Sequence, residues 1–204
     1  METSRHPRIE HAARLAGGQG ASPWVQRWSH LVPAGGTVLD VACGQGRHLR
    51  WFYERNHAVV GVDRSQDALD FVADLKRAGR AELICADLES GPWPLADRRR
   101  FDAVVVTNYL WRPLLPRLVE SVAPGGVLIY ETFAVGNETV GRPSRADFLL
   151  QPGELLAACA ALRVVAYEDG FLDRPARFVQ RIAAVHPLPG AQPERYLLDA
   201  GRVR

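Results

Sequence analysis

The chain has 204 residues, of which 47% are hydrophobic and 24% charged, and its formal net charge is +2. These values are typical of a globular protein and argue against a disordered chain, a collagen or a coiled coil. A near-neutral chain gives no indication of strong non-specific attraction to nucleic acid or to a membrane surface. No apolar run approaches the roughly 18 residues that cross a membrane, and the polar first residues do not resemble a secretory signal.

The three cysteines give information about metal binding, disulfides and the cellular compartment. Cys43, Cys85 and Cys159 are widely spaced and form neither a zinc-ligand pattern nor a disulfide framework. We therefore expect no metal site. We also expect a cytoplasmic protein, because the cytosol keeps thiols reduced.

Short apolar runs alternate with longer amphipathic stretches along the middle of the chain, and the length fits one domain. We expect residues 1–21 to be a flexible arm, residues 22–186 the folded domain and residues 187–204 a C-terminal tail. In chain order, the predicted strands are residues 37–41, 58–62, 81–85, 101–106, 127–130, 162–167 and 178–185. The predicted helices cover residues 23–31, 45–55, 66–78 and 114–122, and a last helix opens at residue 152.

The alternation of strands and helices predicts parallel pairing with right-handed crossovers. The strands are mostly continuous runs of valine, isoleucine and leucine, as in a sheet covered on both faces. No helix of crossover length separates the last two strands, so we expect these two to pair antiparallel. The predicted fold is an α/β, Rossmann-like doubly wound sheet in a single domain.

A glycine turn follows the first strand, at Cys43-Gly44-Gln45-Gly46. Glycines allow a ligand to approach the backbone closely, and ligands of such sheets lie beyond the carboxyl ends of the strands. The third glycine of the dinucleotide fingerprint is absent, since Ala42 precedes the turn. Taken alone, this segment is weak evidence for a ligand site, and an ordinary strand-to-helix turn is the less favoured alternative.

Carboxylates follow the next two strands. Asp63 ends the second strand, where it could accept both hydroxyls of a ribose or cap the helix that begins after Ser65. Asp87 follows the third strand, where it could accept an adenine amino group or lie in a solvated loop. A glycine turn and two acids at three neighbouring strand ends favour a nucleoside site.

These motifs resemble the class I S-adenosylmethionine (SAM)-dependent methyltransferases, and more narrowly the small stand-alone bacterial ones of tellurite-resistance type. The resemblance covers about residues 22–186 and rests on Asp40-x-Ala42-Cys43-Gly44-x-Gly46, Gly61-Val62-Asp63, Ala86-Asp87-Leu88, Phe101-Asp102 and Pro124-Gly125-Gly126. It implies a seven-stranded sheet in the order 3-2-1-4-5-7-6 with the seventh strand antiparallel, and SAM as the cofactor.

The resemblance also implies positions for the cofactor. Ala42, Cys43 and Gly44 would line its methionine part, Gly46 belongs to the same turn, and Asp40 would lie near it. Asp63 would hold the ribose and Arg64 would flank the adenine. Asp87 and Leu88 would meet the adenine edge, and Asn108 would face the reacting end. One departure from the family pattern is Ala42, which replaces the first glycine of the motif.

Candidate acceptor-side residues follow the fourth and fifth strands. Asn108 and Glu131 are the candidate catalytic residues, with Glu131 as the possible base. Tyr109, Tyr130 and Arg142 are candidate substrate contacts, Arg142 as an anion binder. Glu131 and Arg142 could instead only tie down the polar loop at residues 135–146, which has the position of a substrate-covering loop.

Methyl transfer to a small molecule is the leading functional hypothesis. The segment Asn108-Tyr109-Leu110-Trp111 lacks the two prolines found in methyltransferases that act on base amino groups, so nucleic acid is possible but not indicated. RNA or protein methylation, a non-catalytic SAM-binding scaffold and a nicotinamide-dependent oxidoreductase are the alternatives. The incomplete glycine fingerprint and Asp87 disfavour the last. The sequence does not determine the oligomeric state.

Overall fold

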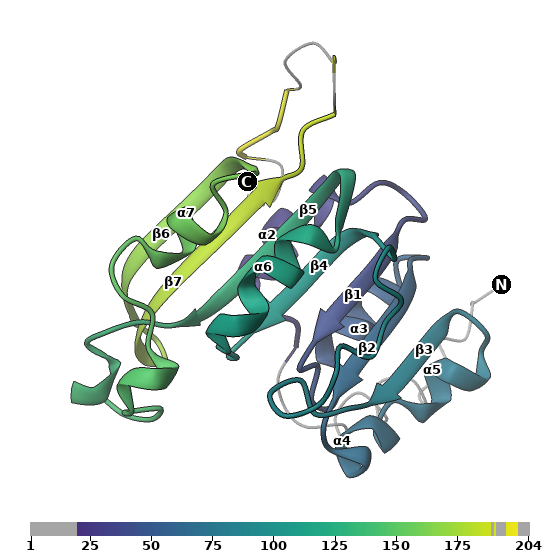
Figure 1. Ribbon diagram of the computed structural model, residues 1–204, viewed down its shortest axis with the longest axis horizontal. Coiled ribbons are helices and arrows are strands. Elements are labelled where there is room, and N and C mark those ends of the chain that lie inside the picture. The colour runs from purple at the N-terminus through teal and green to yellow at the C-terminus, as the bar shows by residue number, and fades with distance from the viewer. Residues whose placement is uncertain (1–19, 189, 191–194, 200–204) are drawn as a thin grey trace, which may run out of the picture.

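The computed structural model describes residues 20–188, 190 and 195–199. The expected flexible arm therefore lies almost entirely outside the described residues, as does about half of the expected C-terminal tail. The seven strands are β1 (Thr37–Val41), β2 (Ala58–Asp63), β3 (Ala81–Cys85), β4 (Phe101–Thr107), β5 (Val122–Phe133), β6 (Arg163–Asp173) and β7 (Ala176–Val185). They form one sheet in the order β3-β2-β1-β4-β5-β7-β6, which confirms the predicted fold (Figure 1).

The pairing directions also follow the prediction. Strands β1 to β5 pair in parallel, whereas β7 runs antiparallel to both β5 and β6. The β6–β7 connection is a tight hairpin, and a hairpin can only join antiparallel strands. Consequently the loops after β1, β2, β3, β4 and β5 meet at one edge of the sheet, together with the β6–β7 hairpin.

Helices cover both faces of the sheet (Figure 1). They are α2 (Pro23–Trp28), α3 (Arg47–Tyr53), α4 (Gln66–Asp70), α5 (Ala73–Arg77), α6 (Leu115–Glu120) and α7 (Glu154–Ala158). Four 3₁₀ turns connect elements, namely η1 (Ser29–Leu31), η2 (Arg112–Leu114), η3 (Asn137–Thr139) and η4 (Ala146–Phe148). Because strand side chains alternate between faces, one apolar cluster packs under α6 and α7 and the other under α2 to α5.

Helix α2 begins as its sequence predicts. The Ser22 hydroxyl accepts a hydrogen bond from the Trp24 N–H, and Pro23 occupies the first helical position. Trp24 and Trp28 are buried in the cluster under α2, and the Trp24 indole N–H donates to the Ile182 carbonyl. This helix is therefore fixed to the sheet beside β5 and β7.

Two segments differ from the predicted elements. The predicted helix 66–78 is broken at Phe71–Val72 into α4 and α5, and the break packs Val72 against the position of Gly46. Strand β5 starts five residues earlier than predicted, because the Pro124-Gly125-Gly126 segment stays in the strand. A Cβ atom on Gly126 would lie 2.9 Å from three backbone oxygens, so only glycine fits this close approach.

Candidate functional site

Two cavities lie at the edge of the sheet where β1 to β4 end. The first, which we call the acidic pocket, measures about 230 Å³, and its lining residues are Ala42, Asp63, Arg64, Ala86, Asp87, Leu88, Glu89, Tyr109 and Phe148. The second, the glycine-loop pocket, measures about 380 Å³, and its lining residues are Ala42, Cys43, Gly44, Gln45, Arg47, His48, Thr107 and Asn108. Both cavities share Ala42, so they form neighbouring parts of one cleft.

The turn after β1 has an unusual backbone. Ala42, Gly44 and Gly46 have φ angles of +53°, +53° and +69°, in the left-handed region. Glycine adopts this region without cost, but an alanine is strained there by about 1–2 kcal/mol. The departure of Ala42 from the family pattern thus places an L-residue in a conformation that suits glycine.

Gly46 differs in role from the other two positions. A Cβ atom on Gly46 would lie 2.7 Å from a methyl carbon of Val72, and the residue is buried. Gly46 lines neither cavity and instead permits close packing at the start of α3. Gly44 has open space where a side chain would project, so this residue is the one that leaves room for a ligand.

The Asp63 carboxylate connects the end of β2 to the glycine turn. Its Oδ2 atom accepts from the Gly44 N–H at 2.7 Å, and its Oδ1 atom accepts from the Ser65 N–H at 2.9 Å. Ser65 in turn caps α4 by accepting from the Ala68 N–H. A carboxylate has about four acceptor positions, so Asp63 can still accept two hydroxyl groups on its pocket side.

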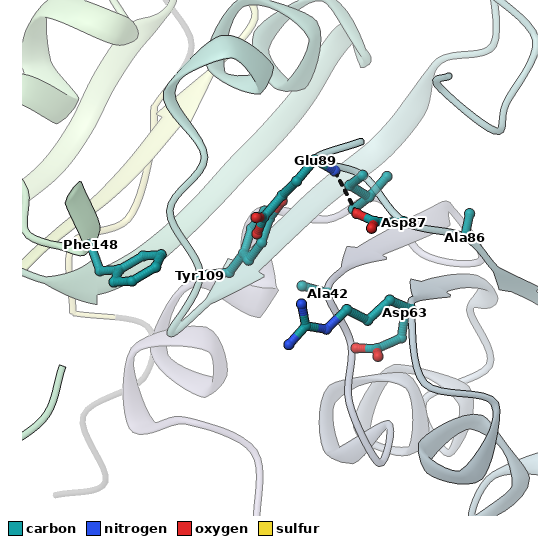
Figure 2. Close-up of a pocket in the computed structure, with 9 residues that line it drawn as sticks. Ala42, Asp63, Ala86, Asp87, Glu89, Tyr109 and Phe148 are labelled. Atoms are coloured by element: carbon teal, nitrogen blue, oxygen red, sulfur yellow. Dashed lines mark hydrogen bonds between the residues drawn. The ribbon is translucent and has the colours of Figure 1, made fainter. Parts of the chain in front are cut away.

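Asp87 is held in a different way. Its carboxylate accepts hydrogen bonds from the Ser90 hydroxyl and from the N–H groups of Glu89 and Ser90, which close a turn after β3. These hydrogen bonds, the Ser90 hydroxyl foremost, lower the pKa of Asp87 below its ordinary value. In Figure 2, Asp63 and Asp87 lie on one side of the pocket and Phe148 on the other, with Tyr109 between them.

A buried polar network lies behind the glycine turn. Burial raises the pKa of Asp40 to about 8, although the positive charge of Arg47 opposes the rise. Burial lowers the pKa of His48 to about 3, so its imidazole is neutral. The Ser22 N–H donates to Nε2 of His48, which leaves the imidazole proton on Nδ1, 3.8 Å from Oδ2 of Asp40. The network thus joins the start of α2 to β1.

Glu131, the candidate base, lies in the same buried region. Its Oε1 atom accepts from the Ser22 hydroxyl at 2.8 Å, and its Oε2 atom accepts from Arg181 at 3.3 Å. Arg177 lies 3.7 Å from Oε1. The carboxylate is only 1% exposed and lines neither cavity. Its contacts are those of an anchor between α2, β5 and β7.

The other acceptor-side candidates separate into two groups. Asn108 lines the glycine-loop pocket with φ +54°, and its backbone N–H donates to the Glu131 carbonyl. Tyr109 lines the acidic pocket. Tyr130 is buried and supports it from behind, by donating its hydroxyl to the Tyr109 carbonyl at 2.8 Å. Arg142 is exposed on the loop after β5 and is not part of either pocket lining.

Cys43 is buried, and desolvation, with the nearby charges of Asp40 and Asp63, raises the pKa of its thiol. A protonated, buried thiol acts as a small apolar side chain. No cluster of side chains that could hold a metal ion occurs within the described residues. In the same part of the chain, no helix has the length and apolar character needed to cross a membrane.

Sequence reasoning missed several lining residues. Phe148 reaches the acidic pocket from η4, beyond the loop that was expected to cover the substrate. Glu89 lies two residues after Asp87, whereas Arg47 and Thr107 lie beside Gly46 and Asn108. These three residues could have been predicted from the sequence, because they flank the motifs. Phe148 was not, since no local pattern indicates how a long loop folds back.

Comparison with known proteins finds a matching family model and similar proteins. Residues 38–126 match a family model described as a methyltransferase domain. A tRNA U34 carboxymethyltransferase of Klebsiella pneumoniae subsp. pneumoniae is 32% identical over 169 residues, covering 74% of this chain and 49% of that protein. The protein of the same name from Pseudoalteromonas translucida is 31% identical, and the match covers 74% of this chain and 50% of that protein. The chain therefore spans about half the length of the curated relatives it matches.

Solved structures share the fold. TehB from Haemophilus influenzae superposes with a TM-score of 0.61 at 18% identity, covering 90% of this chain and 63% of that one. A TehB-like SAM-dependent methyltransferase from Corynebacterium glutamicum gives the same score and identity, covering 88% and 94%. The glycopeptide N-methyltransferase MtfA, solved with sinefungin, gives 0.58 at 19% identity, covering 84% and 95%. The chain therefore carries a SAM-dependent methyltransferase domain, which the family model matches over residues 38–126.

Proposed function

We propose that the protein transfers a methyl group from SAM to a small-molecule acceptor, with the cofactor lying across both cavities. The observation that carries this proposal is the continuous cleft around Ala42, which has acids and aromatic rings on one side and the glycine turn on the other. The adenosine part would occupy the acidic pocket, and the methionine part the glycine-loop pocket. Within this arrangement the sulfonium carbon lies near Asn108.

Individual contacts follow from the geometry. Asp63 accepts the two ribose hydroxyls while its remaining acceptor positions hold the Gly44 and Ser65 N–H groups. Tyr109 and Phe148 supply ring faces for the adenine, and Asp87 with Leu88 forms the edge that meets its amino group. Arg64 flanks the same ring system. Cys43 and Gly44 border the methionine chain, and Asp40 lies behind them.

The reaction makes few chemical demands on the protein. The acceptor attacks the methyl carbon as the carbon–sulfur bond breaks, and the leaving group departs as a neutral thioether, so no acid is needed. Alignment of the two reactants and exclusion of water can supply about 7–11 kcal/mol of the rate enhancement. A base is needed only for an acceptor that must lose a proton first.

The contacts of Glu131 bear on whether this residue could act as the base. Its carboxylate already accepts from Ser22 and Arg181 and lies outside both cavity linings. We therefore favour an anchoring role for Glu131 over the role of base, although its partners lie on α2 and β7 and not in the loop at residues 135–146. An acceptor that is nucleophilic in its ionised form at neutral pH, such as a carboxylate or an acidic thiol, fits a site of this kind.

RNA methylation is the second candidate. The observation in its favour is the name of the curated relatives, tRNA U34 carboxymethyltransferases, at 32% identity over 74% of this chain. The near-neutral net charge of +2 opposes it, because binding to phosphate backbones depends on excess basic charge.

Two measurements test the proposal. Calorimetry should detect binding of S-adenosylhomocysteine and no binding of NAD, and the reverse result would overturn the cofactor assignment. Labelled methyl transfer from SAM should then enter the low-molecular-weight fraction of an extract of the source cell. Label that enters total RNA alone would favour the second candidate. Binding without transfer to either fraction would favour a scaffold.

A further inference from the structure

A row of charged side chains crosses the sheet beside the glycine-loop pocket. Glu131 on β5, Arg181 on β7 and Glu168 on β6 are register neighbours, so they face the same side of the sheet. Arg181 donates to both carboxylates, and Arg27 of α2 pairs with Glu168 at 3.3 Å. This row holds α2 against the sheet.

Arg177 lies on the same face of β7, four residues before Arg181 and closer to the edge of the sheet where β5 ends. Its side chain is 18% exposed, and the one ion pair that it makes within the described residues is long, 3.7 Å from Glu131. Within the described residues it makes no hydrogen bond, and its buried Nε atom has no partner. A guanidinium has five N–H donors, and buried donors are normally satisfied. Arg181, by contrast, uses its donors on Glu131 and Glu168.

Arg177 is not among the lining residues of either cavity, but it lies near Arg47, which lines the glycine-loop pocket. Val179 pairs with Phe133, so Arg177 extends beyond the end of β5, where the acceptor must approach. Arg177 also lies close enough to Arg47 to lower the pKa of that guanidinium, and Arg47 lines the glycine-loop pocket. Four arginines in this part of the described chain, Arg27, Arg47, Arg177 and Arg181, lie around the two carboxyl groups of Glu131 and Glu168.

We propose that the methyl acceptor is a small organic acid, and that Arg177 binds its anionic group at the acceptor side of the cleft. The inference rests on the proposed function and adds the chemical class of the acceptor. A carboxylate or similar oxyanion would receive the N–H donors that Arg177 does not use, in the bidentate geometry that guanidinium groups favour. Arg177 is then a specificity residue that positions the acceptor in line with the methyl carbon.

The test uses the full chain and a fractionated extract. The low-molecular-weight extract is separated on an anion exchanger near neutral pH before the reaction, because methylation of the acid itself would remove its charge. Each fraction is offered with labelled SAM to the wild-type protein and to Arg177→Gln, Arg177→Lys and Arg174→Gln. Arg174 is the matched control, since it is three residues away, 94% exposed and paired only with Asp173. S-adenosylhomocysteine binding is measured for every variant.

We expect acceptor activity in the retained, anionic fraction. Arg177→Gln should raise the acceptor KM about tenfold to hundredfold, the effect of losing charge-assisted hydrogen bonds. Arg177→Lys should recover part of the loss, Arg174→Gln should match the wild type, and all variants should bind S-adenosylhomocysteine equally.

Other results overturn the inference. Activity confined to the neutral or cationic fraction excludes an acidic acceptor. An unchanged KM in Arg177→Gln removes the assigned residue, and a loss of S-adenosylhomocysteine binding in parallel places Arg177 at the cofactor instead. Label in RNA alone excludes a small acid. In each of these cases the wild-type protein still binds S-adenosylhomocysteine, so only the inference fails. If the wild-type protein does not bind S-adenosylhomocysteine, the proposed function is rejected as well.

Discussion

Replacement of Asp63 by asparagine perturbs the contact between the end of β2 and the glycine turn. In the native protein both carboxylate oxygens accept backbone N–H groups, from Gly44 at 2.7 Å and from Ser65 at 2.9 Å. An asparagine side chain keeps one acceptor oxygen and turns an N–H₂ group toward the other backbone donor. One of the two contacts must therefore be lost, while the side-chain volume is unchanged.

The size of the effect follows from these contacts. A hydrogen bond to a charged group contributes about 1.5–3 kcal/mol, and exposure of Asp63 to the pocket places the loss near the lower limit. For a domain of this size 1 kcal/mol shifts Tm by about 2–4 °C, so we expect a decrease of roughly 3–6 °C. Loss of the charged acceptor for the ribose hydroxyls should weaken S-adenosylhomocysteine binding by about tenfold to hundredfold.

Calorimetry and thermal unfolding, both with and without S-adenosylhomocysteine, measure these effects. Asp67→Asn is the matched control, because Asp67 is an exposed acid on α4 that lines neither cavity. Its Tm and affinity should remain those of the wild type. Equal affinity of Asp63→Asn and wild type for S-adenosylhomocysteine would refute the ribose contact. A weaker affinity in the control as well would show that charge near α4, and not the Asp63 contact, determines binding.

Three further substitutions probe the cleft. Ala42→Gly removes left-handed strain of about 1–2 kcal/mol, but the greater entropy of the unfolded chain costs about 0.4–1 kcal/mol, so Tm should rise by up to roughly 6 °C. A lower Tm would contradict the strain at φ +53°. Because burial raises the pKa of Asp40 from 3.8 to about 8, the native state retains a proton that the unfolded state releases, and stability from this group is lost as pH rises through that window. Asp40→Asn removes this loss of stability, so the Tm of the variant minus that of the wild type should increase from pH 4 to pH 8. A Tm difference that does not change with pH would exclude the raised pKa of Asp40. Phe148→Ala should weaken S-adenosylhomocysteine binding by about fivefold to hundredfold, the range for one base–aromatic contact, whereas an unchanged affinity would place the ring outside the site.

Much of the fold and of the cofactor side was predictable because their signals are local. The β1 and β3 segments are short, mostly apolar runs, and the structure has them at the predicted bounds, residues 37–41 and 81–85. Asp63, Asp87 and the glycine turn lie at strand ends, and parallel topology brings consecutive strand ends together at one edge. Sequence order alone therefore predicts that these groups line one cleft. Helix 66–78 was wrong in one detail, because the break at Val72 depends on packing against Gly46, a contact made through tertiary structure.

The acceptor side depends on contacts between distant residues. Ser22 and Glu131 are 109 residues apart, and Arg181 follows Glu131 by 50, yet their side chains meet in one buried group. No periodic pattern in the sequence indicates contacts between residues so far apart. The sequence therefore did not show that the Glu131 carboxylate is paired. The antiparallel β7 strand is what introduces arginines at this edge, since its first residues lie beside the last residues of β5.

This arrangement suggests a division of labour within the cleft. In the proposed complex, residues at the ends of β1, β2 and β3 would face the parts of SAM that all SAM-dependent enzymes bind, and their motifs are correspondingly recognisable. The proposed acceptor side is formed by β5, the loop at residues 135–146 and the β6–β7 hairpin, where no shared ligand constrains the sequence. Acceptor choice can then change through residues such as Arg177 without disturbing Asp63 or the glycine turn. The Arg177 and Asp63 substitutions should accordingly separate, one altering the acceptor KM and the other cofactor affinity.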